Sequence, residues 1–483
     1  MKFFLLLLFF PTLVFAKNNY IKETLNLPPE EGIYNFKESF KRLLLTDVIE
    51  RGLRKNFNEQ VRAYTKSLLD IDFKDTKAEF WWPRLTLELH TNPQKVGKII
   101  SSEGTKDNAT STYPSGVLEL RFEDYNLFNW GKDYLLYLND KATYSRDKKR
   151  IKERTRELKH RLIKTFFSVD FRKKVEKTLR DQLQKANFVY RFNREKVLSK
   201  KTNKQDFLQA RSDFLRIQNL YLTAKRESEF AEEELARSIA DLPGSRYLLG
   251  DTLKYKKMRT PILEATRISR NNSPLVLDAK LIYENASRSY EYQVRENLPL
   301  PKFEVKLGTY AFMFGPDGGK GQYATSPGNK NIELVASINA VWAITGRNGI
   351  LNTRRLRRSL VENRRESKNL ERSTYFIDSR IRQRYKMIHY YERQIELGEA
   401  RVKTNIRTYD LILERYTSKK TSWINTNRAL EELATSQIEL DRLKFEHLKE
   451  KVDLASTIGV EDFPGDNFEN LAKRMKGKST TSP

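Results

Sequence analysis

The sequence predicts a mainly helical protein that also carries membrane-type β-strands, built from two copies of one structural unit. Residues 132–242 contain neither Gly nor Pro, the two residues that most often interrupt helices. Residues 350–458 contain no Pro and a single Gly, Gly398. Short stretches in which polar and apolar residues alternate, the period-2 pattern of strands, precede each helical run. The predicted unit is therefore a helix, two strands and two long helices, and it occurs twice.

A repeated polar motif supports the duplication. Ser199-Lys200-Lys201-Thr202 recurs as Ser418-Lys419-Lys420-Thr421, at an offset of 219 positions. The same offset maps Ala210 onto Ala429. Because each motif lies inside a helical run, we expect it to form a tight tip between two long helices of one repeat.

The helix that follows the first tip carries a coiled-coil seam. Its apolar residues are spaced by three and four positions in turn, which is typical of long helices that pack side by side. Each long helix would hold roughly 40 to 65 residues and extend roughly 60 to 100 Å. The seam residues are Phe207, Ala210, Phe214, Ile217, Tyr221 and Ala224.

The N-terminus is typical of an exported protein. Residues 1–16 hold one Lys, an apolar run and a Val14-Phe15-Ala16 ending, which predicts a signal peptide cleaved after Ala16. A membrane anchor would need about 20 apolar residues. Residues 17–37 are expected to form an irregular lead-in. The chain has no Cys, so it has no disulfides, as fits a bacterial envelope protein.

The formal charge of +27 would ordinarily favour nucleic acid or an anionic surface. Export argues against nucleic acid, which leaves lipopolysaccharide, acidic cargo and acidic partner proteins open. Charged residues make up 32% of the chain, and no later segment is predicted to span a membrane as a helix. Strands must therefore make any membrane contact.

The first repeat is expected at residues 38–250. Its opening helical stretch is interrupted near Asn56, as the second repeat's is at Asn272-Ser273-Pro274. Alternating leucines then predict a strand at about 84–91, and a second strand at about 116–126 returns after a long polar loop.

The second repeat is expected at residues 255–465 and follows the same order. Its strands are predicted at about 302–314 and 331–342, separated by a Gly-rich loop at 315–330. Residues 466–483 are polar and are expected to form a mobile C-terminal tail.

The four predicted strands have the length that crosses a bilayer in a β-barrel. Four strands cannot close, since the smallest bacterial barrels have eight, and backbone groups in lipid must all be paired. Oligomerisation follows if the strands meet lipid. The alternative is a soluble four-stranded sheet on a helical stalk.

The duplicated order resembles the TolC-like outer-membrane efflux protein family. That family has a Gly-x-x-Ser-x-x-Asp-x-Leu-x-Ala motif at the second helix of each pair, and the first copy here keeps Asp206, Leu208 and Ala210. The second copy keeps Ser422 and Ala429. The segment 127–132, Leu-Phe-Asn-Trp-Gly-Lys, is similar to the family's strand-exit motif.

The resemblance implies a homotrimer in the outer membrane. Its twelve pooled strands would form a β-barrel, continued through the periplasm by a coiled-coil tunnel of long helices. Such a channel is an exit duct for small-molecule efflux or type I protein secretion. It works with a periplasmic adaptor and an inner-membrane efflux pump or ABC transporter, and it is not an enzyme. The second hypothesis is a non-channel periplasmic scaffold that bridges envelope components.

The resemblance also assigns site residues, with departures from the family pattern. The tips, Ser199 to Lys201 and Ser418 to Lys420, would dock the adaptor, although Lys200 and Lys419 replace the family's glycines. The predicted pore constriction consists of Asn425 and Arg428, where the family often has acidic residues. Arg428 would either ring the entrance with positive charge or pair with Glu431 or Glu432. Tyr416, Lys420 and Thr421 would form the gating contact.

The sequence offers no site for chemistry. The four histidines, His90, His160, His389 and His447, are isolated and lack metal-ligand spacing. We therefore expect no metal, no cofactor and no catalytic residue.

Overall fold

The structure is a computed structural model. The predicted signal peptide and lead-in lie outside the described residues, as do the tip residues 199–203 and Lys419. The described residues are 40–82, 84–91, 116–122, 125–198, 204–298, 300, 302–307, 310–316, 323–327, 334–339, 344–345, 353–418, 420–464 and 467–475.

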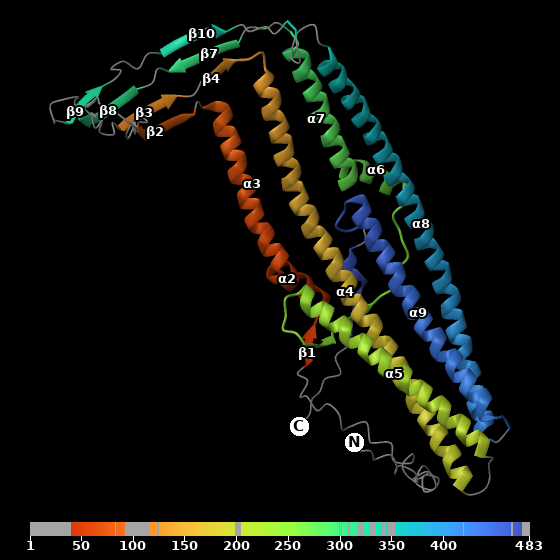
Figure 1. The fold of residues 1–483 in the computed structure, drawn as a ribbon. Coiled ribbons are helices and arrows are strands. Elements are labelled where there is room, and N and C mark those ends of the chain that lie inside the picture. The colour runs from red at the N-terminus through yellow and green to blue at the C-terminus, as the bar shows by residue number, and fades with distance from the viewer. Residues whose placement is uncertain are drawn as a thin grey trace, which may run out of the picture.

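Two long antiparallel helical hairpins form the body of the molecule (Figure 1). The first consists of α4 (Lys132–Leu198) and α5 (Lys204–Ser238), and the second of α8 (Arg354–Thr417) and α9 (Trp423–Ile458). The chain is thus mainly helical, as predicted. The descending helices hold 67 and 64 residues, but the returning helices hold only 35 and 36. The returning helices are shorter because other short helices continue their line toward the sheet (Figure 1).

Shorter helices precede each pair of strands. α2 (Leu45–Lys55) and α3 (Phe57–Trp81) belong to the first repeat, and α6 (Ile262–Asn272) and α7 (Pro274–Glu296) to the second. One extended residue separates each pair. Asn56 has φ −62° and ψ 126°, and Ser273 has φ −63° and ψ 127°. The Asn56 side chain caps α3 by accepting from the amide of Asn58, whereas Pro274 disfavours helical backbone at Ser273. The interruptions predicted near these residues are confirmed.

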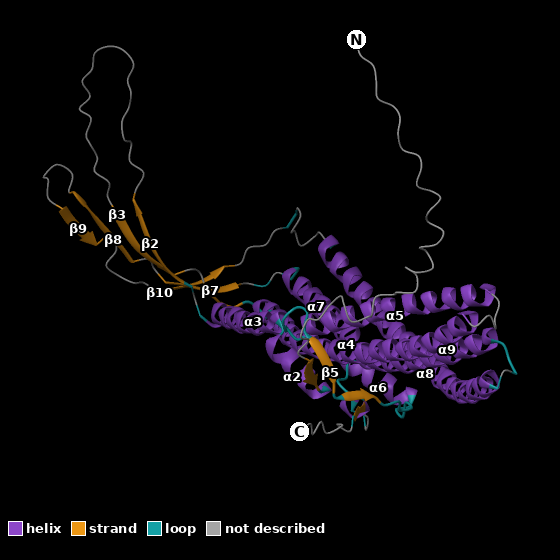
Figure 2. Cartoon of the chain, turned by 90° about the horizontal axis from the view of Figure 1, so that it is seen from below, coloured by secondary structure: helices purple, strands orange, loops and turns teal. Residues whose placement is uncertain are grey.

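The longer strands gather at one end of the helices and pair antiparallel (Figure 2). They form two sheets, one of four strands in the order β2, β3, β8, β9 and one of three strands in the order β10, β7, β4. β3 and β4 follow each other closely along the chain, as do β7 and β8. The bounds are β2 Leu85–Thr91, β3 Gly116–Phe122, β4 Tyr125–Phe128, β7 Lys302–Leu307, β8 Tyr310–Pro316, β9 Tyr323–Pro327 and β10 Leu334–Asn339.

The Gly-rich loop predicted at 315–330 is wrong in its extent. β8 continues to Pro316, and β9 (Tyr323–Pro327) lies inside the predicted loop. β8 and β9 pair in register from Phe312 with Pro327 to Pro316 with Tyr323. Backbone pairing here overrides the weak strand preference of Gly and Pro.

Four short strands were not predicted. β1 (Phe40–Leu43) pairs parallel with β5 (Arg246–Leu249), and β6 (Asp251–Leu253) pairs antiparallel with β11 (Ala472–Arg474). A 3₁₀-helix, η1 (Phe468–Leu471), leads into β11. Three or four residues are too few for a periodicity to be visible in the sequence.

The tail predicted to be mobile from residue 466 is packed over residues 467–475. Phe468 and Leu471 are 1% and 2% exposed and belong to the main hydrophobic core. Lys159 on α4 lies 2.7 Å from a Glu461 carboxylate oxygen and 3.6 Å from one of Glu469. Two apolar side chains therefore hold in place a segment whose composition is mostly polar.

Residues that are 219 positions apart in the sequence also occupy equivalent places in the structure. The main core lies at mid-height, where both hairpins meet the short helices, the short strands and the tail. Equivalent positions on the two descending helices are buried there. Leu158, Leu162, Phe166 and Val169 on α4 correspond to Ile377, Ile381, Tyr385 and Ile388 on α8, and all of them are buried.

Equivalent residues also end the two returning helices. Ala240 after α5 has φ 52°, and Gly459 after α9 has φ 87°. Both backbones turn left-handed to close the last helical turn, a conformation that favours Gly. A Cβ added to Gly459 would lie 2.0 Å from the Asn272 carbonyl oxygen. Gly is therefore required at the second site, whereas the first accepts Ala at some cost.

Candidate functional site

Tyr416, predicted to help hold a closed state, lies where both hairpins meet near their tips. Its side chain is 4% exposed and packs with Val189, Ala210 and Trp423. The ring of Phe192 meets it edge-on, with centroids 5.9 Å apart. Since these residues come from α4, α5, α8 and α9, the cluster that contains Tyr416 joins all the long helices of both hairpins.

The two residues predicted as polar partners of Tyr416 make other contacts. The Lys420 side chain is exposed, and its backbone amide donates to the Arg415 carbonyl at 2.8 Å. The Thr421 hydroxyl oxygen accepts from the Asn425 amide at 3.3 Å. Burial raises the pKa of the Tyr416 hydroxyl, and Asn193 opposes that shift. The described contacts of Tyr416 are therefore made mainly by apolar groups of the first hairpin.

Of the predicted docking tips, the structure describes Ser418 and Lys420. The Ser418 hydroxyl donates to the Glu414 carbonyl at 2.9 Å, which closes the last turn of α8. Ser199, Lys200, Lys201 and Lys419 lie outside the described residues. Docking at the tips stays a prediction.

At mid-height, a pair of charged residues in each repeat holds a passing backbone segment. In the first repeat, Lys173 on α4 donates to the Tyr247 carbonyl, and Glu232 on α5 accepts from the Tyr247 amide at 3.2 Å. The two side chains also form an ion pair of 2.5 Å. One strand residue is thereby held through both of its backbone polar groups.

The second repeat makes the same arrangement with the charges exchanged. Glu392 on α8 accepts from the Met258 amide at 2.8 Å, and Lys451 on α9 donates to the Lys256 carbonyl at 3.2 Å. Glu392 is the equivalent of Lys173 at the offset of 219, and Lys451 is the equivalent of Glu232. We call these two arrangements the first and second backbone clamps.

Two histidines join the second clamp. His389 Nδ1 lies 2.8 Å from one Glu392 carboxylate oxygen, and His447 Nε2 lies 3.4 Å from the other. Burial alone would raise the pKa of Glu392, but hydrogen bonds from His447, the Met258 amide and His389 lower it to about 2. The sequence gives no sign of this contact, because 57 residues lie between the two histidines.

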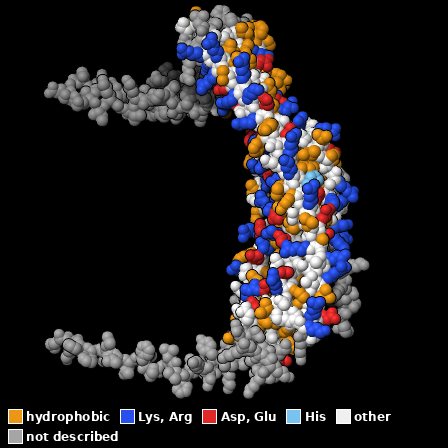
Figure 3. Space-filling model, turned by 90° about the vertical axis from the view of Figure 1, so that its right-hand side faces the viewer, with side chains coloured by type: hydrophobic (Ala, Val, Ile, Leu, Met, Phe, Trp, Pro, Cys, Tyr) orange, Lys and Arg blue, Asp and Glu red, His pale blue; other side chains and the backbone are white. Residues whose placement is uncertain are grey.

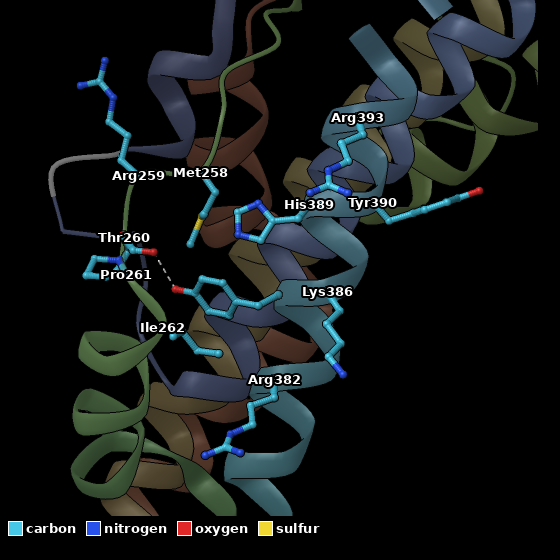
Figure 4. A pocket seen from close by; sticks show the side chains of 11 residues that line it. Met258, Arg259, Thr260, Pro261, Ile262, Arg382, Lys386, His389, Tyr390 and Arg393 are labelled. Carbon is cyan, nitrogen blue, oxygen red and sulfur yellow. Dashed lines mark hydrogen bonds between the residues drawn. The ribbon is translucent and has the colours of Figure 1, made fainter. Parts of the chain in front are cut away.

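A groove of about 800 Å³ lies beside the second clamp, between α8 and the segment that leads into α6 (Figure 4). The Tyr385 hydroxyl donates to the Thr260 carbonyl at 2.9 Å across it. At the positions of Arg382 and Lys386 on α8, α4 carries the buried residues Ile163 and Phe167. The lining residues are Met258, Arg259, Thr260, Pro261, Ile262, Arg382, Tyr385, Lys386, His389, Tyr390 and Arg393.

The groove and the clamps show no metal site. In the part of the chain that the structure describes, no group of three His, Asp or Glu side chains is placed to bind an ion. Within the same residues, every helix lacks a stretch long and apolar enough to cross a bilayer.

The architecture matches solved outer-membrane channels over nearly its whole length. CusC is 14% identical, with a TM-score of 0.67, and the match covers 90% of this chain and 97% of CusC. The chain has the fold of the TolC-like outer-membrane channels. The CmeC channel of Campylobacter jejuni gives 14% identity and a TM-score of 0.66 over 90% of this chain and 93% of CmeC. The outer membrane protein VceC of Vibrio cholerae is 13% identical, with a TM-score of 0.65, and the match covers 88% of this chain and 96% of VceC.

Comparison of sequences alone adds little evidence beyond this TolC-like fold. No protein-family model matches the chain. A segment of 87 residues is 32% identical to the inactive deaminase YJL070C of Saccharomyces cerevisiae. That match spans 18% of this chain and 9% of the yeast protein, so it indicates no shared fold or activity.

The predicted constriction residues of the TolC-like fold lie on the first turns of α9. Asn425 bonds to Thr421, as described above, and Arg428 Nε lies 3.2 Å from a Glu432 carboxylate oxygen. The Arg428 and Glu432 side chains are 79% and 53% exposed. Glu431 instead pairs with Arg216 on α5. Of the two alternatives, the single chain therefore shows the pairing with Glu432, at an exposed position where water weakens it.

Proposed function

We propose that the protein is an outer-membrane exit duct that acts as a homotrimer with a periplasmic tunnel. The observation that carries this proposal is the pair of open sheets at the end of the two hairpins, in which β2 and β9 are the edge strands of one sheet and β10 and β4 those of the other. Backbone groups on such edges need partners in lipid, and bacterial barrels have at least eight strands. Three copies would supply twelve strands and close one barrel.

The described outer residues of the sheet are compatible with lipid. Leu85 and Leu87 on β2 are 53% and 66% exposed in the single chain. The register places Leu85 opposite Phe122 and Leu87 opposite Leu120 on β3. Apolar residues therefore occupy alternate, paired positions, as on the lipid face of a barrel.

The long helices support the tunnel and its partners. Three copies of the two hairpins would continue the barrel away from the membrane, with the tips farthest from it. A periplasmic adaptor and an inner-membrane efflux pump or ABC transporter would complete the path for small molecules or secreted proteins. This part of the proposal rests on the TolC-like fold.

Mass measurement in detergent tests the assembly. We expect three copies per particle, outer-membrane fractionation and heat-modifiable migration on gels. Leu87→Asp should reduce the amount of trimer, since a charge near the bilayer midplane costs up to about 2–4 kcal/mol, with Asp below Lys and Arg. Thr86→Asp, on the other face of β2, is the matched control. A monodisperse monomer in the soluble periplasmic fraction would instead support the scaffold.

Charge reversal tests docking at the tips. Lys200, Lys201, Lys419 and Lys420 give the tips of each chain four positive charges, which favours an adaptor with an acidic end, since complementary charge sets specificity and encounter rate. Changing all of them to Glu should abolish copurification with the adaptor while the trimer persists. Unchanged copurification would contradict the role of charge.

A further inference from the structure

The groove beside the second backbone clamp is lined by cations and by no acidic residue. Arg382, Lys386 and Arg393 come from α8, and Arg259 comes from the segment that leads into α6. All four side chains are exposed, and none of them pairs with a residue that the structure describes. Glu392, beside the groove, is already engaged in the second clamp. Figure 3, which views the side on which α8 lies, shows Lys and Arg side chains spread along it. The charge of the groove is therefore not compensated within the single chain.

Thr260 adds a buried hydroxyl group to the wall of the groove. The residue is 6% exposed, and its Oγ1 makes no hydrogen bond to any described residue. Its backbone carbonyl, in contrast, accepts from the Tyr385 hydroxyl. Burying a hydroxyl without a partner costs free energy, and such groups are rare in folded proteins. An unpaired hydroxyl in a groove lined by cations indicates a ligand that bonds to it.

The first repeat shows what occupies the equivalent place. The offset of 219 maps residues 259–262 onto β1, Phe40–Leu43. β1 pairs with the extended strand β5, which also contacts α4 because Lys173 donates to the Tyr247 carbonyl. No described strand pairs with residues 259–262. An extended backbone therefore contacts both the segment and the descending helix in the first repeat, whereas the second repeat has a groove between the corresponding elements.

The dimensions of the groove suit a short extended peptide. Arg382 and Arg393 stand at its two ends (Figure 4) and are eleven positions apart on α8, which is about 16 Å along a helix. An extended chain advances about 3.3 Å per residue, so about five residues cover that distance. Between the two arginines the lining includes the apolar and aromatic side chains of Met258, Ile262 and Tyr385.

We propose that this groove binds an extended acidic peptide, a segment of a partner protein that has a carboxylate at each end and apolar residues between them. The carboxylates pair with Arg382 and Arg393, since a guanidinium binds a carboxylate through two parallel hydrogen bonds. The peptide backbone offers a donor and an acceptor at each residue, and either one satisfies the Thr260 hydroxyl. A single small anion would reach only one of the two arginines. The inference does not rest on the proposed function, because the groove lies within one chain.

Peptide binding to the purified full-length protein in detergent tests the proposal. The probe is a fluorescent hexapeptide with two glutamates at each end and two leucines between them, and fluorescence anisotropy measures its affinity. The reference peptide has glutamine in place of each glutamate. We expect the acidic peptide to bind more tightly by about tenfold or more, because only its carboxylates pair with the arginines.

Two variants locate the binding site. Arg382→Glu with Arg393→Glu should weaken binding by about tenfold or more, because both ends of the groove then repel carboxylates. Arg407→Glu is the matched control, since Arg407 is exposed and without a described partner on the same helix, about 21 Å beyond Arg393. Thr260→Val should weaken binding roughly three- to tenfold by removing one hydrogen bond. It should not destabilise the free protein, in which the hydroxyl has no partner.

Several results would overturn the inference. One is equal affinity for the glutamine peptide, and another is equal weakening by the Arg407 control. Displacement of the peptide by millimolar inorganic phosphate at constant ionic strength would show a site for any small anion. Absence of binding to the wild type would show that the groove is closed to peptides, as when a second copy covers it. The mass in detergent separates this inference from the proposed function. A trimer without binding leaves the channel standing, whereas a monomer that binds the peptide leaves only the groove.

Discussion

The two backbone clamps both bind one amide and one carbonyl of a passing segment, but their acidic and basic residues have exchanged positions. In the first repeat the cation, Lys173, is on the descending helix and the anion, Glu232, is on the returning helix. In the second repeat the anion, Glu392, is on the descending helix and the cation, Lys451, is on the returning helix. Each clamp satisfies one amide and one carbonyl of the segment that passes over the hairpin.

The difference shows which property of these positions matters. A backbone segment presents one donor and one acceptor, so a clamp needs one acidic and one basic side chain, and either order serves. The surroundings then fix the order. Arg246 lies 3.0 Å from Glu232 in the first clamp, whereas His389 and His447 surround Glu392 in the second. Only the second clamp includes histidine among its described contacts.

The largest effect should come from the helix ends beside the clamps. Gly459→Ala should lower the free energy of unfolding by about 2–5 kcal/mol, because it adds a Cβ in left-handed backbone against the Asn272 carbonyl. The first repeat has Ala240 at this position, and Ala240→Gly should be neutral or stabilising by up to about 1 kcal/mol. Urea unfolding in detergent measures both. If Gly459→Ala changed the free energy of unfolding as little as Ala240→Gly does, the two helix ends would not differ in packing.

Neutralising the clamps should have the next largest effect. Glu392→Gln removes a buried charge on which three donors converge and should cost about 3 kcal/mol. Glu232→Gln should cost less, about 1–2 kcal/mol, because its partner Lys173 is 29% exposed and can turn to water. Unfolding of both variants, with Lys173→Glu plus Glu232→Lys as a restored pair, tests the comparison. A first clamp as sensitive as the second would contradict it.

The histidines should make the second clamp depend on pH. Burial lowers the pKa of His447 below 6.5, so the unfolded chain binds its proton first and stability falls as pH drops below about 6.5. Glu392, with its pKa lowered from 4.5 to about 2, adds a further loss between those values as pH falls. Unfolding midpoints between pH 8 and pH 4 should show a slope that His447→Gln reduces. His160, also buried with a lowered pKa, should retain its own part of the slope.

The change with the smallest expected effect on stability is at Arg428, the residue predicted to lie at the channel entrance. Its effect is measured on ion selectivity. If three copies of Arg428 ring a narrow mouth, the channel favours anions, and Arg428→Asp moves selectivity toward cations because a confined mouth focuses the field. Gln209→Asp, at the equivalent position of the first repeat, is the matched control. Reversal potentials under a KCl gradient in planar bilayers measure both. A cation-selective wild type that is indifferent to Arg428→Asp would show that the arginine does not line the mouth.

The long hairpins, their duplication and the interruptions at Asn56 and Ser273 could be predicted because each leaves a periodic or local signal. The clamps could not, since exchanging Lys173 for Glu392 and Glu232 for Lys451 hides their equivalence from any comparison of residue types. Tyr416 was identified from the family pattern, but its apolar partners depend on how the two hairpins meet. The short strands and the packed tail depend on contacts between residues that lie far apart along the chain.

The pairing of β11 with β6 sets an order of events during folding. β6 lies in the connection between the repeats, and its partner strand comes after both of them in the chain. When such a protein crosses a membrane N-terminus first, its whole first repeat emerges before this strand pair can form. Residues 467–475 can therefore pack only after both repeats have been translocated. A truncated chain that ends before residue 467 would leave the core surface that Phe468 and Leu471 cover exposed to quality-control proteases.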